Sequence, residues 1–162
     1  MSYYEGVVLE YLRRDRALFA NPEYCVQIEP GRVPPKGTHW YCDVVTVDFS
    51  SKTIFLCEIS YSKTQGALVK RLGSWSDNWG AVCKAVNRDS MLPEGWQVRP
   101  WLFVPDERLG ILIRGLEQIG GTNFKPRITT LDMIQPWKCE EYRTEEDLKM
   151  KARHEIPEAM WT

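Results

Sequence analysis

Apolar side chains recur along the chain with two spacings, and each spacing predicts one kind of secondary structure. Apolar residues three or four positions apart predict helices over 3–18, 62–88 and 107–121. Short, nearly continuous apolar runs predict strands over 24–30, 41–48, 53–60, 98–106 and 126–134. Three strands follow one another without a helix, and the later strands alternate with helices. This order predicts an α/β fold in which a mixed central sheet is flanked by helices on both faces.

Length and composition predict a single domain over residues 1–162. Hydrophobic residues make up 43% of the chain, which is enough to bury a core without disulfides or structural metals. The predicted core covers about residues 3–134, and a charged C-terminal tail covers about 135–162. A peripheral helix is expected from about residue 144 of that tail.

The predicted hairpin over 41–60 holds two acids, Asp43 and Glu58, in an otherwise apolar run. If its turn centres on Ser50 and Ser51, residues equally distant from the turn face each other, and Asp43 lies opposite Glu58. Opposed residues have Cβ atoms about 4.5–5.5 Å apart, so the two carboxyls would lie side by side on one face. A three-residue loop would instead put one acid on the other face.

Two explanations of such a pair are open. The acids can form ion pairs with Arg or Lys from a covering helix, or lie in water at the open end of the sheet. Alternatively they can bind a divalent cation, because like charges side by side repel and half-buried carboxylates are costly unless paired or bound to metal. Hard cations such as Mg²⁺ often use only one or two carboxylates together with a substrate phosphate.

The element order and the two acids together resemble the PD-(D/E)XK nuclease superfamily, whose restriction-endonuclease-like core has the order α-β-β-β-α-β. The resemblance covers about residues 3–106. It implies a metal-dependent phosphodiesterase acting on nucleic acid, with DNA as the expected substrate of an endonuclease or exonuclease. Mg²⁺ or Mn²⁺ would be bound by Asp43 and Glu58, and Glu10 of the first helix would be a further ligand. Members of this superfamily often work as homodimers or in larger complexes.

The chain departs from the family motif at Ser60, where the family carries a lysine two residues after the acid. Some members carry this lysine on the following helix, which makes Lys63 and Lys70 candidate catalytic residues. Both can equally be ordinary surface lysines. The alternative is therefore a catalytically inactive nuclease-fold protein that serves as a binding or assembly module.

Further candidates for binding nucleic acid flank the two acids. Arg32 and Lys36 lie in the Gly/Pro-rich loop that leads to Asp43, where they could contact phosphates. Gln65 follows Glu58 at a position where many relatives carry a polar motif residue. A capping box, with Ser62 as the N-cap of the next helix, would also explain this glutamine.

Net charge and cysteine usage restrict the expected binding partners and the cellular compartment. With 21 basic and 22 acidic residues, the chain has no overall positive field for nucleic acid, so binding would need local patches or metal ions. The five cysteines form no C-x-x-C pair, which predicts buried free thiols in a reducing compartment. No secretory signal and no membrane span are predicted, so the expected location is the cytoplasm.

Overall fold

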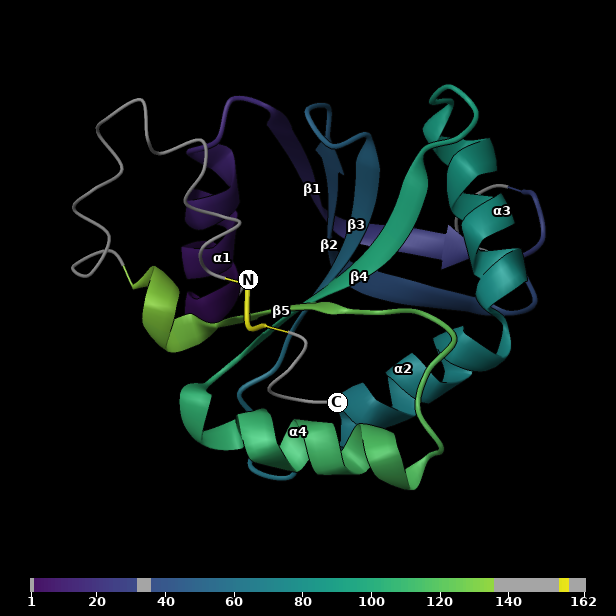
Figure 1. Ribbon diagram of the computed structural model, residues 1–162. Coiled ribbons are helices and arrows are strands. Elements are labelled where there is room, and N and C mark those ends of the chain that lie inside the picture. The colour runs from purple at the N-terminus through teal and green to yellow at the C-terminus, as the bar shows by residue number, and fades with distance from the viewer. Residues whose placement is uncertain (1, 32–35, 136–154, 158–162) are drawn as a thin grey trace.

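The computed structural model describes residues 2–31, 36–135 and 155–157. Ten elements follow one another in the described chain: α1 (Tyr3–Arg13), β1 (Leu18–Gln27), β2 (His39–Asp48), β3 (Thr53–Ile59), α2 (Gly66–Asp77), α3 (Trp79–Ser90), β4 (Gln97–Val104), α4 (Asp106–Gln118), β5 (Arg127–Thr130) and the 3₁₀ helix η1 (Leu131–Ile134). The predicted α/β class with a mixed central sheet flanked by helices is confirmed (Figure 1).

The five strands lie in the order β1-β2-β3-β4-β5. The first three form an antiparallel meander, and β4 and β5 then add in parallel to β3. The turn position that was predicted between β2 and β3 is confirmed, because Val45 pairs with Leu56 and Asp48 with Thr53. Asp48 fixes this turn: its carboxylate accepts hydrogen bonds from the hydroxyls of Ser50 and Ser51, both at 2.7 Å.

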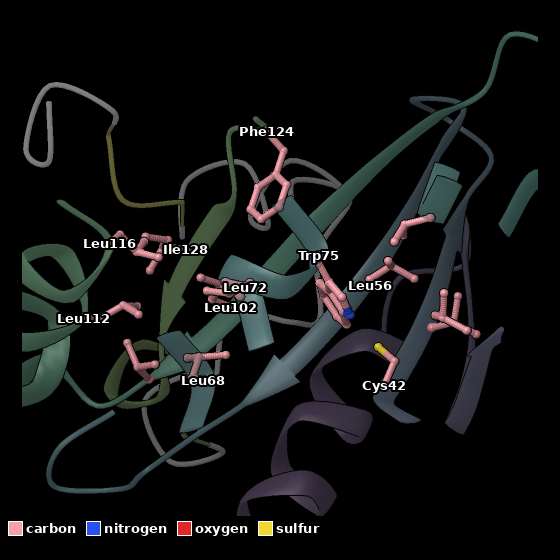
Figure 2. Packing of buried hydrophobic residues seen from close by; sticks show 14 of the residues in the cluster. Cys42, Leu56, Leu68, Leu72, Trp75, Leu102, Leu112, Leu116, Phe124 and Ile128 are labelled. Carbon is pink, nitrogen blue, oxygen red and sulfur yellow. The ribbon is translucent and has the colours of Figure 1, made fainter. Parts of the chain in front are cut away.

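Each face of the sheet has its own core. Helices α2, α3 and α4 cover one face, and their buried side chains pack with Leu56 and Leu102 of the sheet (Figures 1 and 2). Helix α1 and η1 cover the other face, where Leu12 and Ile134 pack on Phe55 and Trp101. Successive strand residues point to opposite faces, so β3 is apolar on both sides and lies inside the sheet.

The predicted helix over 3–18 is too long, since α1 ends at Arg13 and β1 begins at Leu18. Asn21 and Pro22, which were expected to terminate a helix, lie inside β1. Proline is tolerated there because β1 is an edge strand, where an N–H can be missing without leaving a neighbouring strand unpaired. The next residue, Glu23, has φ 56° and interrupts the regular pairing with β2.

The predicted helix over 62–88 is two helices, α2 and α3, with a break at Asn78. Its predicted capping box is also wrong. Helix α2 begins at Gly66, and its N-cap residue is Gln65, which has φ 57° and makes no side-chain capping bond. The predicted strand over 126–134 is shorter as well, because β5 ends at Thr130 and η1 follows. The tail helix expected from about residue 144 lies outside the described residues.

Four cysteines lie in the described ranges, and all four are free thiols: Cys25, Cys42, Cys57 and Cys83. Cys42 and Cys57 are fully buried, as predicted, whereas Cys25 and Cys83 are only partly buried. No helix in the described part of the chain is both long and apolar enough to span a membrane.

The crossing of α2 and α4 yields a stability test. A Cβ at Gly115 would lie 2.7 Å from Cγ2 of Val69, a stiff β-branched side chain, whereas a Cβ at Gly110 meets nothing closer than the flexible end of Arg114 at 3.4 Å. Alanine gains up to about 1 kcal/mol of helix propensity at either position. We expect Gly110→Ala to stabilise the folded protein. Gly115→Ala should destabilise it by about 1–2 kcal/mol, because overpacking against Val69 outweighs the gain in helix propensity. Urea unfolding of both variants measures this. Equal stabilisation by the two would show that the helices do not cross there.

Candidate functional site

The structure brings Asp43 and Glu58 together. The regular pairing of β2 with β3 ends at Val44 and Cys57, and just beyond it the negative charge of Asp43 acts on the carboxyl of Glu58. The backbone N–H of Ile59 donates to Asp43 Oδ2 at 2.8 Å. Asp43 therefore reaches across to β3 with its side chain at the point where the backbone ladder stops.

A third side chain, Arg71 of α2, completes the cluster. Its Nη1 donates to both oxygens of Glu58, at 2.9 and 3.1 Å, and to the carbonyl oxygen of Tyr41 at 2.7 Å. Its Nε and Nη2 make no hydrogen bond with any other residue in the described ranges, and a third of the side chain is exposed. Arg71 thus ties α2 to β2 and β3 and still has donors that face solvent.

The cluster carries more negative than positive charge. Glu58 is only 5% exposed, and this burial, followed by the negative charge of Asp43, raises the pKa of Glu58 to about 8 in spite of Arg71. Burial also raises the pKa of Asp43; the N–H of Ile59 opposes this effect, and the charge of Glu5 adds to it. One guanidinium faces the carboxyls of Asp43 and Glu58, and the charge of Glu5 acts on Asp43, so a proton or another cation is needed for balance.

The acid that α1 contributes is Glu5, not the predicted Glu10. Glu10 is exposed, whereas Glu5 lines a cavity of about 120 Å³ together with Asp43. Glu5 is held in place by a capping box, in which its carboxylate accepts from the N–H of Ser2 at 3.0 Å. Glu10 therefore does not reach the pair, and Glu5, about one and a half turns earlier, is the acid of α1 that lies near Asp43.

Neither predicted lysine joins the cluster. Lys63 and Lys70 are exposed, and their ammonium groups make no ion pair or hydrogen bond with other residues that the structure describes. Arg71, the neighbour of Lys70, supplies the positive charge instead. A sequence signal for it exists: Arg71 lies three residues after Leu68 and directly before Leu72, which places it at the edge of the buried stripe of α2.

Gln65 is fully buried, so its side chain is not exposed for contact with nucleic acid. Its Nε2 donates to the carbonyl oxygens of Ser60 and Ser62, at 3.3 and 2.7 Å, and thereby fixes the segment that follows Glu58. The N–H of Ser60 is also used, since it donates to the carbonyl oxygen of Phe103 at 3.0 Å. Lys36 is exposed at the loop before β2, and Arg32 lies outside the described residues.

The donor set restricts which metal the cluster can hold. In the described parts of the chain, no three His, Cys, Asp or Glu side chains lie close enough together to bind a metal ion. This excludes a four-ligand protein site of the structural zinc type for those residues. Two adjacent carboxyls with surplus negative charge do fit Mg²⁺ or Mn²⁺, which can take their remaining ligands from water and phosphate.

No family model matches the chain, and no curated protein or solved structure matches it. The nuclease resemblance therefore depends on the element order and on the Asp43–Glu58 pair.

The charge surplus predicts an unusual dependence of stability on pH. Because the folded-state pKa of Glu58 is about 8 and the ordinary value is 4.5, the folded protein binds more protons than the unfolded chain between these values. The free energy of unfolding therefore falls as pH rises from about 5 to about 8, by at most on the order of 1.4 kcal/mol per pH unit.

Substituting Glu58 tests this directly. In Glu58→Gln the pH dependence should be much weaker, because the titrating group is gone, whereas Glu94→Gln, at an exposed acid, should behave as wild type. Chemical denaturation across this pH range measures the difference. A Glu58→Gln variant with the wild-type slope would show that Glu58 is not the group that keeps the proton.

Proposed function

We propose that the protein is a divalent-cation-dependent phosphodiesterase acting on nucleic acid, with Asp43, Glu58 and Arg71 at its centre. The observation that carries the proposal is the pair of carboxyls, Glu58 buried and Asp43 partly buried, whose charge Arg71 offsets only in part. Asp43 and Glu58 would hold Mg²⁺ or Mn²⁺. When bound, such an ion lowers the pKa of water and stabilises negative charge on a phosphate.

Arg71 would supply the positive charge that the family motif obtains from a lysine at the position of Ser60. A guanidinium stays charged at any pH of interest, so Arg71 can stabilise charge on a phosphate but cannot accept a proton. Its Nε and Nη2, free of bonds within the described chain, are suited to two oxygens of one phosphate. Glu58 therefore has two functions: it orients Arg71 and it would bind the cation.

The substrate is proposed to be DNA, which reaches the cluster from its solvent-facing side. Lys63, exposed in the segment after β3, and Lys36, exposed in the loop before β2, are proposed phosphate contacts, together with Arg32. We place the protein in the cytoplasm, where the free thiols of residues such as Cys25 and Cys83 stay reduced.

One observation favours a second candidate, a catalytically inactive binding or assembly module. Arg71 already contacts both oxygens of Glu58, which is how a purely structural ion pair would look. In that case the cluster joins α2 to the sheet and has no affinity for divalent cations. The two candidates differ in their response to Mn²⁺ and in the role of Arg71.

We expect Mn²⁺ to raise the melting temperature of the wild-type protein by about 5–10 °C when its concentration is about 100-fold above its Kd. The increase should be larger at about pH 8 than at about pH 6, since binding competes with the proton on Glu58. Asp43→Asn should abolish it, and Asp77→Asn, at an exposed acid of α2, should not. Thermal unfolding with and without EDTA measures the effect. An equal response of the two variants would contradict a site at Asp43.

We expect Arg71→Met to reduce nicking of supercoiled plasmid DNA by at least about 100-fold, because removing one preorganised charge from a reacting centre costs this much. Lys70→Met is the matched control: it removes the neighbouring cation, whose side chain faces solvent, and should leave the rate unchanged. Arg71→Lys should keep part of the activity. Full activity in Arg71→Met would contradict the proposed role, and nicking by Asp43→Asn would indicate a contaminating nuclease.

A further inference from the structure

Two exposed tyrosine rings lie close to the Asp43–Glu58 pair, one on the chain segment of each acid. Tyr41 lies two residues before Asp43 on β2, and Tyr61 lies three residues after Glu58, just beyond β3. An extended chain spans at most about 3.6 Å per residue, so each tyrosine Cα is within about 11 Å of the Cα of its acid. The two residues are 46% and 53% exposed. The candidate site therefore has accessible aromatic surface on both of the segments that build it.

The ring of Tyr61 is exposed but held in place. Buried Gln65 donates to the carbonyl oxygens of Ser60 and Ser62, the two neighbours of Tyr61. The ring itself packs on Tyr4 of α1, with centroids 4.7 Å apart and 37° between the planes. A ring that is already fixed loses little conformational freedom when a planar ligand stacks on it, which favours binding.

Tyr41 is tied to the same cluster of charged side chains. Its carbonyl oxygen accepts from Nη1 of Arg71 at 2.7 Å, and the same Nη1 donates to Glu58. Its ring packs edge-on against His39, with centroids 5.8 Å apart, and Tyr41 lines the cavity of about 120 Å³ that Asp43 also lines. Arg71 is thus bonded to the backbone of one tyrosine and to the acid that precedes the other.

Charge alone does not attract a polyanion to this place. Glu5, Glu23 and Asp43 all line the cavity beside Tyr41, so a phosphate is repelled there unless the proposed cation is bound. Aromatic rings supply an attraction of another kind, because every base has a π-face that can stack. In a duplex those faces are covered by the neighbouring bases, and only unpaired nucleotides can be splayed out to offer them.

We propose that the candidate site takes nucleic acid that is unpaired where it is cleaved, with bases stacked on Tyr61 and Tyr41 and a phosphate at the cation and Arg71. The inference rests on the proposed function for the polymer and the cation. It adds the form of the substrate, which is a single strand or an unpaired end and not an intact duplex. The two tyrosines are specificity residues in this account.

The test compares the affinities for single-stranded and paired DNA. Fluorescence anisotropy is measured for a labelled oligothymidine of about 15 nucleotides and for a duplex of the same length, in Ca²⁺, which takes oxygen ligands as Mg²⁺ does. Wild-type protein should bind the single strand at least about tenfold more tightly than the duplex, since two stacked bases contribute to one complex and not to the other. EDTA should weaken binding.

Substitution of the rings makes the result specific. Tyr61→Ser and Tyr41→Ser should each weaken single-strand binding at least about fivefold, the lower end of what one stacked base contributes, and leave duplex binding unchanged. Tyr61→Phe and Tyr41→Phe should bind as wild type, because stacking needs the ring and not the hydroxyl. Phe19→Ser is the matched control: it removes a residue that is 63% exposed and pairs with Val47, four residues along β2 from Asp43.

A second measurement locates the bases without any substitution. 5-Iodouracil in the strand cross-links under near-ultraviolet light to aromatic rings on which it stacks, and mass spectrometry identifies the linked residue. Cross-links at Tyr61 and Tyr41 are expected. Cross-links only at aromatic residues away from the acids, such as Trp96, would overturn the inference.

The outcomes separate this inference from the proposed function. Equal affinity for single strand and duplex, or serine variants that bind as Phe19→Ser does, would overturn the inference even if cation-dependent nicking is found. Single-strand binding through the two tyrosines without any nicking would overturn only the phosphodiesterase. A wild-type dimer that binds no oligonucleotide and becomes monomeric in Tyr61→Ser would assign the rings to a second copy of the chain and overturn the inference.

Discussion

Two carboxyls lie side by side at the ends of β2 and β3, Glu58 buried and Asp43 partly buried, and the rest of the structure depends on this constraint. An uncompensated buried charge costs several kcal/mol, so Asp43 and Glu58 need nearby partners. The β2–β3 register sets the two acids together, and Gln65 fixes the segment after Glu58. Helix α2 starts where that segment ends and brings Arg71 over the pair. Each of these features lowers the free-energy cost of holding two carboxylates together away from water, and none removes that cost.

The charged groups differ between the two ends of the central strands. At the C-terminal end of β3, carboxyls outnumber the single guanidinium of Arg71. At the N-terminal ends of β3 and β4, Arg99 and Arg127 share the carboxylate of Glu155, and Asp15 and Asp48 line a cavity with both arginines.

Much of the fold, and the closeness of Asp43 to Glu58, could be predicted from the sequence, because strands and turns depend on the local pattern of residues. The Asp43–Glu58 pairing followed from the turn at Ser50 and Ser51. The boundary between α1 and β1 could not be predicted in this way. Pro22 indicates the end of an element unless it is known that its strand lies at the edge of the sheet. Arg71 was missed for a related reason: the pattern of α2 gives its buried stripe, but packing on the sheet decides which flanking cation reaches an acid.

The central claim is that Asp43 and Glu58 form a divalent-cation site that Arg71 balances only in part. The most direct measurement is the anomalous difference map of a crystal grown or soaked with Mn²⁺ near pH 8. The account predicts a peak within about 2.0–2.6 Å of carboxyl oxygens from both Asp43 and Glu58. Saturating Mn²⁺ with no peak there, and with Arg71 still bonded to both oxygens of Glu58, would contradict it.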